Sequence, residues 1–453
     1  MPSPERLGWW PSLRLLIWKE LCELAESRAA WLLFAVSSVL VGHAFGDALQ
    51  FYAEASGSGG GPAALSQSLS PLDGIVVPVF GAYDLVATLV FPFVVIRLFA
   101  AERATGELAL SLQVPGRFWV VPTAKTVALY IAWMLSLLPA FIALGIWKAD
   151  GGHLAAPETL TVIAGYLVRG LLTIGIGAAA CSITGSGSSA AIITLTITLG
   201  GWMLDYAAAA KGGMIGVLSM YTPEAALRSA ERGELRVVAS VIPKTIGILG
   251  VVLWAGSVQT GRAMQWRART AAVAFSVALA ICVIGVMADH SWDTSEDRRN
   301  SFAEADERAL SSVDGTLKVT VHLAAEDPRL HDLERGVLFK LLRTVRHLEV
   351  TYASKSRSGL FESSSSYGET WYELGDRRVV TRSVAEPVVL ESLYELMKVT
   401  PPVAQSTTYP GYPARIESRI APWLFFALIP LALAFFWWGL HNRRFDISPI
   451  PTA

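Results

Sequence analysis

The stretch RLFAAERATGELALSLQVPGRFWVVPTAK, residues 97–125, decides the architecture of this 453-residue chain. It is rich in charge, contains a Pro-Gly turn, and joins two long apolar runs at residues 76–100 and 121–147. Apolar runs of about 20 residues are long enough to cross a lipid bilayer. The sequence therefore predicts a loop at a membrane face that presents six charged residues to water: Arg97, Glu102, Arg103, Glu107, Arg117 and Lys125.

The composition agrees with a membrane protein that also has some soluble mass. Hydrophobic residues make up 53% of the chain and charged residues 17%, against a usual charged share of about 25%. The net charge of −1 gives no sign of a nucleic-acid partner. Three cysteines, Cys22, Cys181 and Cys282, lie in or beside apolar segments, so neither a disulfide framework nor zinc-type spacing is expected.

Eight apolar segments predict membrane-spanning helices: 29–51, 76–100, 121–147, 159–183, 188–208, 237–260, 270–288 and 420–440. Residues 8–28 precede the first span and place five apolar side chains on one helical face: Leu13, Leu16, Ile17, Leu21 and Leu24. This pattern predicts an amphipathic helix that lies on the membrane surface, with a short soluble helix as the alternative. The expected fold class is a polytopic α-helical membrane protein with one α/β domain inserted before the last helix.

Orientation follows from the basic residues of the short loops. Most of these Lys and Arg residues fall on the side of the N-terminus, which is therefore expected to be cytoplasmic. An even number of spans returns the C-terminus to the same side. The predicted units are the interfacial helix 1–28, a six-span domain 29–262, a seventh span 263–288, an extracytoplasmic domain 289–418, and the last span with its tail 419–453.

The hydrophilic block 289–418 has the pattern of an α/β domain. Strands are expected at 317–323 and 347–352, and the amphipathic helix 330–342 between them predicts a βαβ unit. A Ser-rich loop at 354–366 follows. The rest predicts a hairpin around Gly375-Asp376, a helix at 386–397 and a proline-rich connector to the last span.

No catalytic constellation is present in the sequence. The chain has no GxxxxGK[ST], HExxH, GxSxG or CxxC motif, and His322, His331 and His347 are scattered without carboxylates at ligand spacing. The chain is therefore expected not to be an enzyme, and no metal site is expected.

Two ionisable residues fall inside predicted spans, where burial is costly unless the charge is paired or meets water. Asp84 lies in the second span and Arg169 in the fourth, at depths that could match. We expect them to pair across the bundle interior or to line a water-filled path. The alternative is that Asp84 lies near the interface and Arg169 extends its side chain toward it.

The order of motifs along the first half resembles a known family. Trp18-Lys19-Glu20 precedes the first span, and the second span ends in Pro92–Arg97 and runs into Glu102-Arg103, Gly106-Glu107-Leu108 and Pro115. This resembles the permease subunits of type-2 ABC exporters, especially the gliding-motility and nitrous-oxide-reductase-maturation types. The usual Gly-Thr-Leu-Glu of that family lacks its Thr here. From residue 281 onward, Asp293–Arg299 and Leu317–Val321 resemble the start of the gliding-motility auxiliary protein, as if a shortened auxiliary subunit were fused to a permease.

The resemblance implies a partner and a site. In that family a separate ABC ATPase contacts the interfacial helix and the first cytoplasmic loop. The resemblance implies that the corresponding contact residues in this chain are Lys19, Glu20, Glu102, Gly106 and Glu107. ATP and Mg²⁺ would bind to that ATPase, with no cofactor in this chain. Two permease chains would pair in a bacterial inner membrane, and the outer domain would meet substrate or a periplasmic partner.

The same sequence is compatible with other functions. Glu102 and Glu107 could simply form a solvated helix face with local ion pairs. The protein could be a non-transporting scaffold that transmits ATP-driven motion to an outer partner, or a sensor whose outer domain binds a ligand. Lipid, polysaccharide, peptide and small drug are all open as substrates.

Overall fold

The computed structural model describes residues 9–56, 69–105, 119–211, 222–259, 262–313, 315–324, 327–353, 366–402 and 411–442. Within these residues, eight helical segments are long and apolar enough to cross a membrane, which confirms the predicted number of spans by length and composition. They are α2 (Arg28–Ala55), η1 with α4 (Leu72–Val76, Val77–Thr105), α6 with α7 (Val120–Ser136, Leu138–Ala149), α8 (Ala156–Ile183), α9 (Gly187–Lys211), α12 (Val237–Ser257), α13 (Met264–Met287), and α18, η4 with α19 (Ala421–Trp423, Leu424–Leu428, Ile429–Asn442). The chain is a multi-pass helical membrane protein.

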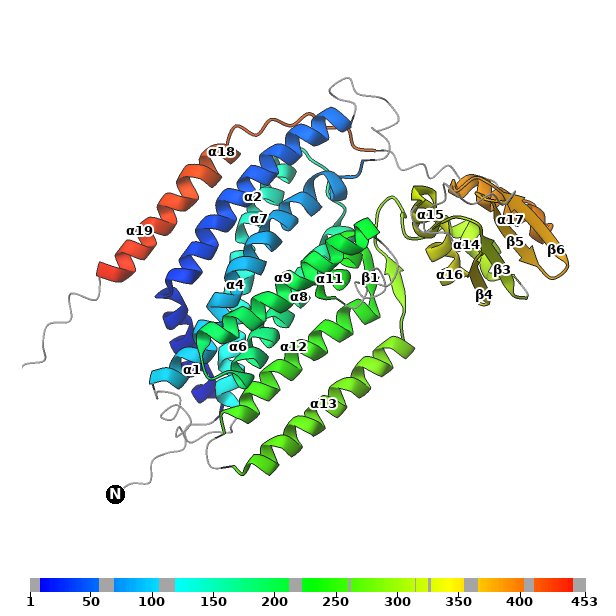
Figure 1. The fold of residues 1–453 in the computed structure, drawn as a ribbon. Coiled ribbons are helices and arrows are strands. Elements are labelled where there is room, and N and C mark those ends of the chain that lie inside the picture. The colour runs from blue at the N-terminus through cyan, green and yellow to red at the C-terminus, as the bar shows by residue number, and fades with distance from the viewer. Residues whose placement is uncertain are drawn as a thin grey trace, which may run out of the picture.

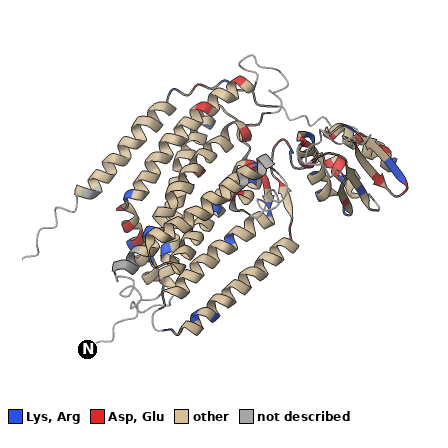
Figure 2. Ribbon diagram, in the orientation of Figure 1, with Lys and Arg blue, Asp and Glu red and all other residues tan. Residues whose placement is uncertain are grey.

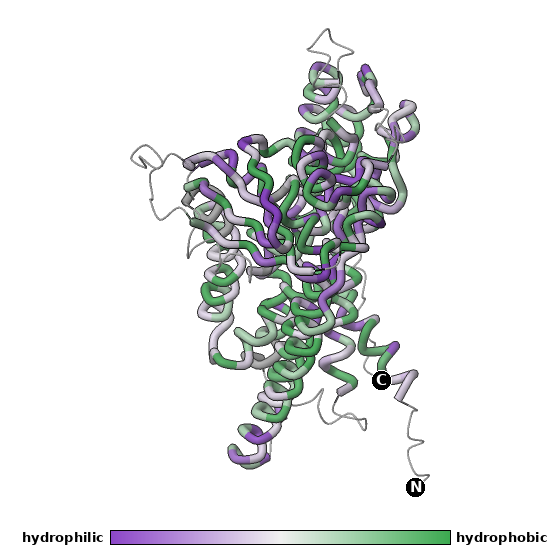
Figure 3. Tube along the Cα trace, turned by 90° about the vertical axis from the view of Figure 1, so that its right-hand side faces the viewer, coloured by the Kyte–Doolittle hydropathy of each residue, from purple (hydrophilic) through white to green (hydrophobic). Residues whose placement is uncertain are grey.

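The long helices lie side by side in one bundle (Figure 1). Helix α1 (Trp9–Ala25) lies at one end of this bundle, which we call the α1 end, and an α/β unit lies at the other, which we call the α/β end. Charged residues are sparse along the helices and gather at α1 and in the α/β unit (Figure 2). A side view coloured by hydropathy shows the same division, with mostly hydrophobic helices and a more hydrophilic α/β unit (Figure 3).

The middle of the bundle is built around α4. Its residues Phe80, Tyr83, Phe91 and Phe99 are fully buried, and α4 packs against α2, α8 and α9. In contrast, α13 and α19 expose most of their apolar side chains. Helices that face lipid need no polar outer surface, so this exposure fits a helix at the periphery of a membrane bundle.

Helices α8 and α12 touch through three glycines, Gly175, Gly247 and Gly250, which we call the glycine seam. A Cβ atom added at Gly175 would collide with the backbone of Gly247, and one added at Gly250 would collide with the backbone of Gly175. Small residues at such contacts let two helix backbones approach closely. This seam lies within one chain.

The third predicted span is broken into two helices. Helix α6 ends at Ser136 and α7 begins at Leu138, with Pro139 in its first turn. Proline has no backbone N–H, so it fits the start of a helix but not its interior.

The α/β unit contains a four-stranded sheet of order β4-β3-β5-β6. Its strands are β3 (Leu317–Val321), β4 (Leu348–Tyr352), β5 (Thr370–Leu374) and β6 (Arg377–Thr381). Strands β3 and β4 are parallel and are joined by α15, η2 and α16 (Pro328–Leu333, Glu334–Leu338, Phe339–Thr344), so the expected βαβ unit is present. The β5–β6 hairpin turns at Gly375, whose φ of 59° favours glycine. The predicted Ser-rich loop lies almost wholly outside the described residues.

Helices α14 (Glu304–Ser311) and α17 (Glu386–Met397) complete the α/β unit, and its core includes Val319, Val321, Leu341 and Leu393. Between bundle and unit, two three-residue strands pair antiparallel: β1 (Glu234–Arg236) and β2 (Ser291–Asp293). Strand β1 follows the short helix α11 (Pro223–Glu231) and precedes α12, whereas β2 follows α13. The pairing therefore ties the end of α13 to the start of α12.

The glycine seam gives a test of the bundle. In Gly250→Ala the added methyl group meets backbone rather than a flexible side chain, so we expect a loss of stability of about 3 kcal/mol, at the upper end of the usual overpacking cost. Thermal unfolding in detergent measures it. Gly46→Ala in α2 is the matched control, because a Cβ there meets no atom within 4 Å. Equal unfolding midpoints for the two variants would show that α8 and α12 do not touch at the seam.

Candidate functional site

A buried guanidinium lies at the centre of the helical bundle. Arg169, near the middle of α8, is 4% exposed. Its Nη1 atom lies 2.8 Å from Oε1 of Glu224, and its Nε atom lies 3.4 Å from Oδ1 of Asp84. Its Nη2 atom donates a hydrogen bond to Oγ1 of Thr88 at 3.2 Å. These four residues form what we call the Arg169 cluster, and the structure thus brings the two ionisable residues singled out in the sequence together.

Two helices carry the acceptors around Arg169, and a third leaves room for one of them. Asp84 and Thr88 are four residues apart on α4, so they share one face of that helix. Glu224 lies in the first turn of α11, directly after Pro223 at the start of that helix. Helix α9 leaves room for it through Gly201, where an added Cβ would collide with the Glu224 carboxylate.

The charges in the cluster depend on each other. Two carboxylates face one guanidinium, and the side chains of Asp84 and Glu224 are only 13% and 6% exposed. Removing one member of a buried ion pair leaves an uncompensated charge and typically costs about 3–5 kcal/mol. Arg169 is therefore the side chain that permits both carboxylates to be buried at this depth.

Helix α11 is held to α8 at both of its ends. Glu224 at its start pairs with Arg169, and Glu231 at its end accepts a hydrogen bond of 2.8 Å from the hydroxyl of Tyr166. Tyr166 and Arg169 are three residues apart on α8 and so lie one helical turn from each other. A shift of α8 would therefore carry α11 with it.

An aromatic layer lies next to the cluster. The Tyr83 hydroxyl and the Ser136 hydroxyl lie 2.7 Å apart, and the Trp133 indole N–H donates to the carbonyl of Tyr166 at 2.9 Å. The ring of Phe80 lies 5.0 Å from that of Tyr166. These contacts join α4, α6 and α8 and limit the rotation of each helix around the buried charges.

A second buried ion pair fixes α1 at the α1 end. The Nζ atom of Lys125, close to the start of α6, lies 2.9 and 3.0 Å from the two carboxylate oxygens of Glu20 on α1. The exposed fractions of the two side chains are 0% and 2%. The prediction that Lys125 faces water is therefore wrong, because a charged partner from α1 covers it. The tryptophans Trp9, Trp10 and Trp18 of α1 are exposed.

The other residues expected to contact an ATPase are described only in part. Lys19 is partly exposed and pairs with Glu23 at 2.9 Å, one turn along α1. Glu102 lies within the C-terminal part of α4, but its side chain is outside the described structure. Gly106 and Glu107 lie outside the described residues altogether.

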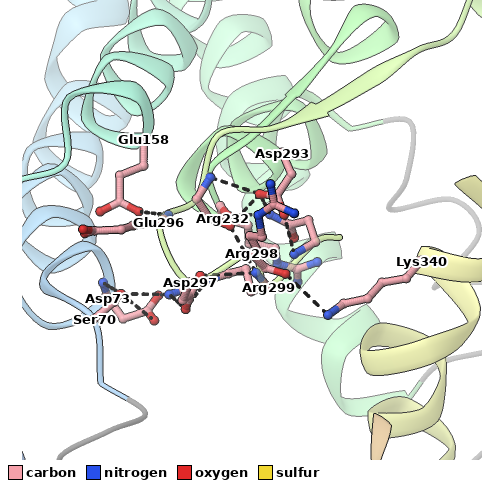
Figure 4. A network of polar contacts seen from close by, with 12 residues as sticks. Ser70, Asp73, Glu158, Arg232, Asp293, Glu296, Asp297, Arg298, Arg299 and Lys340 are labelled. Atoms are coloured by element: carbon pink, nitrogen blue, oxygen red, sulfur yellow. Dashed lines mark hydrogen bonds and ion pairs between the residues drawn. The ribbon is translucent and has the colours of Figure 1, made fainter. Parts of the chain in front are cut away.

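A third cluster joins the bundle to the α/β unit through residues 293–301, which we call the neck (Figure 4). The Arg299 guanidinium donates to Asp73 at 2.6 Å and to Ser70 at 2.8 Å, both beside the start of η1, and also to Asp297. Burial alone would lower the pKa of Arg299, but the hydrogen bonds to Asp297 and Asp73 outweigh it and raise the pKa. Arg299 therefore stays charged and fastens the neck to the helix that continues as α4.

The neck also contacts α8, α11 and the α/β unit. The backbone N–H of Glu296 donates to Glu158 in the first turn of α8 at 3.1 Å, and the Asn300 amide donates to the carbonyl of Arg232. Lys340 of α16 reaches the carbonyl of Arg298 at 3.5 Å (Figure 4). One short segment thus touches two spanning helices, the end of α11 and the α/β unit.

Sequence reasoning missed Glu224, the Lys125–Glu20 pair and the Arg299–Asp73 pair. The run Thr222-Pro223-Glu224 carries a helix-start signal, but nothing in it indicates that the helix enters the bundle. The two other pairs join residues far apart in the chain, so no local pattern signals them.

Among the described residues, no group of three or more His, Cys, Asp or Glu side chains could hold a metal ion. Comparisons of the chain with protein-family models, with curated proteins and with solved structures find no match.

The Arg169 cluster predicts strong coupling between its members. Arg169→Gln should lower the free energy of unfolding by about 3–5 kcal/mol, because it leaves two buried carboxylates without a cation. Adding Glu224→Gln or Asp84→Asn should recover part of the loss, with a coupling energy within the usual 0.5–3 kcal/mol range. The measurement for each pair is a double-mutant cycle, in which the unfolding of the wild type, the two single variants and the double variant is compared in detergent. Strictly additive losses would mean that the tested pair does not interact.

The Lys125–Glu20 pair predicts that α1 depends on α6. In Lys125→Met the Glu20 carboxylate loses its buried partner, so α1 should detach and its amides should exchange hydrogen faster than in the wild type. Arg14→Met removes a positive charge from an exposed position of α1 and should leave exchange in α1 nearly unchanged. Equal exchange in the two variants would contradict the anchoring role.

Proposed function

We propose that this chain is the membrane-spanning permease subunit of an ABC transporter, driven by a separate ATPase that docks on the loop 97–125. It would export a substrate across the membrane or extract one from it. The observation that carries the proposal is the helical stretch from Leu72 to Thr105, η1 and α4. This one stretch leads from the loop to the Arg169 cluster and on to the neck.

The orientation in this proposal follows the basic residues of the sequence. The α1 end faces the cytoplasm with both termini, and the α/β unit lies outside, in a bacterial inner membrane. The exposed Trp9, Trp10 and Trp18 on α1 support a position at the level of the lipid headgroups. The lipid bilayer is then the immediate environment of the exposed faces of α13 and α19.

In this proposal, motion of the ATPase would pass from the loop through α4 to the Arg169 cluster and the neck. An ATPase that pushed on the loop would act on the end of α4 and on α1, which Glu20 and Lys125 fasten to α6. Helices move as rigid bodies, so a shift of α4 would displace Asp84 at the cluster and Asp73 at the neck together. Because Arg169 and Tyr166 hold α11, that helix would follow α8.

The remaining parts of the transporter would be supplied by partners. The sequence has no Walker A motif, so ATP and Mg²⁺ would bind to the ATPase and not to this chain. Two permease chains would form a homodimer around the path, by analogy with the resembled family. The outer domain would contact the substrate or a periplasmic partner.

The neck favours a second candidate of another class, a mechanotransmission protein that moves an outer partner without transport. Arg299 ties the neck, which leads into the α/β unit, to η1 at the start of the helical stretch of α4, through Asp73. In a complex purified with its ATPase, an exporter should hydrolyse ATP in response to a substrate supplied in the membrane or on the cytoplasmic side of the membrane. A transmitter should respond instead to a partner supplied to the α/β unit.

The proposal predicts a complex that depends on the loop. An ABC ATPase should co-purify with the tagged full chain from its native membrane in mild detergent and be identified by mass spectrometry. The double variant Glu102→Ala, Glu107→Ala should reduce both the bound ATPase and the ATP hydrolysis about tenfold or more, because two charged docking contacts are lost.

The control for this experiment is Glu391→Ala, Glu395→Ala, which removes two exposed carboxylates from α17 of the α/β unit. It should keep the ATPase bound. If no ATPase co-purifies with the wild type, the permease assignment fails. If both double variants lose it equally, the loop is not the docking site.

A further inference from the structure

A cavity of about 360 Å³ opens on the side of the bundle, between α6, α8, α11, α12 and β1. Its buried floor includes Thr161, Arg169 and Leu227, whereas Leu235, Arg236 and Lys244 on its rim are exposed. The volume lies in the range of about 300–1,000 Å³ that small-molecule sites occupy. The lining belongs to the first half of α8 and the first part of α12, so the cavity lies in the half of the bundle toward the α/β end.

The cavity ends at the contact between α8 and α12. The glycine seam holds their backbones in contact at Gly175 and Gly247, and Leu171 and Leu172 close the cavity just before that contact. Toward the α/β end, α11 lies against both helices. Pro243 in the wall of α12 has no N–H to donate to the carbonyl of Ala239, which also lines the cavity.

The lining holds three cations, Arg169, Arg236 and Lys244, and one acidic residue, Glu234. Carboxylates outside the lining already pair with Arg169. Arg236 is bound to Asp289 through Nε at 2.8 Å and Nη2 at 2.6 Å, yet its side chain remains half exposed. Cations at the rim of an apolar cavity fit an amphiphile with an anionic head.

Lys244 lies within the spanning helix α12 and is exposed. Its Nζ atom donates to the hydroxyl of Ser240 at 2.7 Å, and no carboxylate of the described residues forms an ion pair with it. An ammonium group within a span needs an anionic or aqueous partner, and a lysine side chain near the end of a span can extend toward the headgroup level.

We propose that this cavity is a lateral binding site for a phospholipid from the bilayer. Lys244 binds the phosphate at the rim, and the apolar side chains of α8 hold part of an acyl chain. The site itself needs no ATPase, but its role as the entry of the transported substrate rests on the proposed permease function. A cationic drug would meet repulsion at this rim, and an uncharged sugar would gain little from the charge.

Occupancy of the cavity bears directly on the Arg169 cluster. Arg169 lines the floor and also pairs with Asp84 of α4 and Glu224 of α11. A ligand that pushes against α8 or α11 at this level therefore acts on the helix that carries the loop. This gives the proposed transporter a direct connection from substrate to ATPase.

The test counts phospholipids on the purified full chain by native mass spectrometry after mild detergent extraction. The wild type should retain phospholipid. Lys244→Gln should weaken retention about tenfold or more, and Lys244→Arg should restore it, because a charge-assisted hydrogen bond to phosphate is lost and regained. Ala164→Phe fills the cavity without a charge change and should also release the lipid.

The matched control is Lys148→Gln, which removes an exposed lysine at the end of α7, also at the α/β end but outside the cavity. Equal retention in Lys148→Gln and Lys244→Gln would overturn the proposal, since Lys244 would then only contact bulk lipid. Retention that survives Ala164→Phe would overturn the placement of the acyl chain. Displacement of the lipid by inorganic phosphate alone would show that the site takes a soluble anion instead.

This experiment and the ATPase co-purification fail independently. If lipid retention depends on Lys244 but no ATPase is bound, the lipid site is supported and the permease assignment is wrong. If an ATPase is bound but lipid retention does not depend on Lys244, the permease assignment is supported and the lipid site is wrong.

Discussion

The burial of one guanidinium in an apolar bundle constrains the arrangement around it. A charge at this depth is tolerated only when carboxylates and hydrogen-bond acceptors surround it, and here two helices, α4 and α11, supply them. Their approach requires space, which Gly201 gives by having no side chain. The position of α11, the spacing of α4 and α8 and the contact with α9 all follow from satisfying Arg169.

The stretch of η1 and α4 connects the Arg169 cluster, the aromatic core and the neck. Asp84 and Thr88 face Arg169, large aromatic side chains fill the core around them, and the helical start near Asp73 is fastened to the neck. The glutamate–lysine pair between α1 and α6 adds a second fixed point at the other end. Polar links at several depths favour movement of whole helices over local adjustment, because small independent rotations would break each link.

The spans could be predicted from the sequence because a bilayer requires long apolar segments with internally bonded backbones. The βαβ unit was also predictable, since alternating strands such as Leu317–Val321 carry their own signal. Asp84 and Arg169 stood out because charges within spans are rare. Their third partner did not, since Glu224 lies in a polar segment whose entry into the bundle depends on tertiary packing. Lys125 shows the same limit: its burial depends on a residue more than a hundred positions away.

The glycine seam has a consequence for the symmetry of the bundle. Close backbone contact at Gly175 and Gly250 leaves no space between α8 and α12 at that level, whereas the cavity lies on the side of this contact toward the α/β end. The two halves of the bundle therefore differ in internal space, and the bundle is asymmetric between its α1 end and its α/β end.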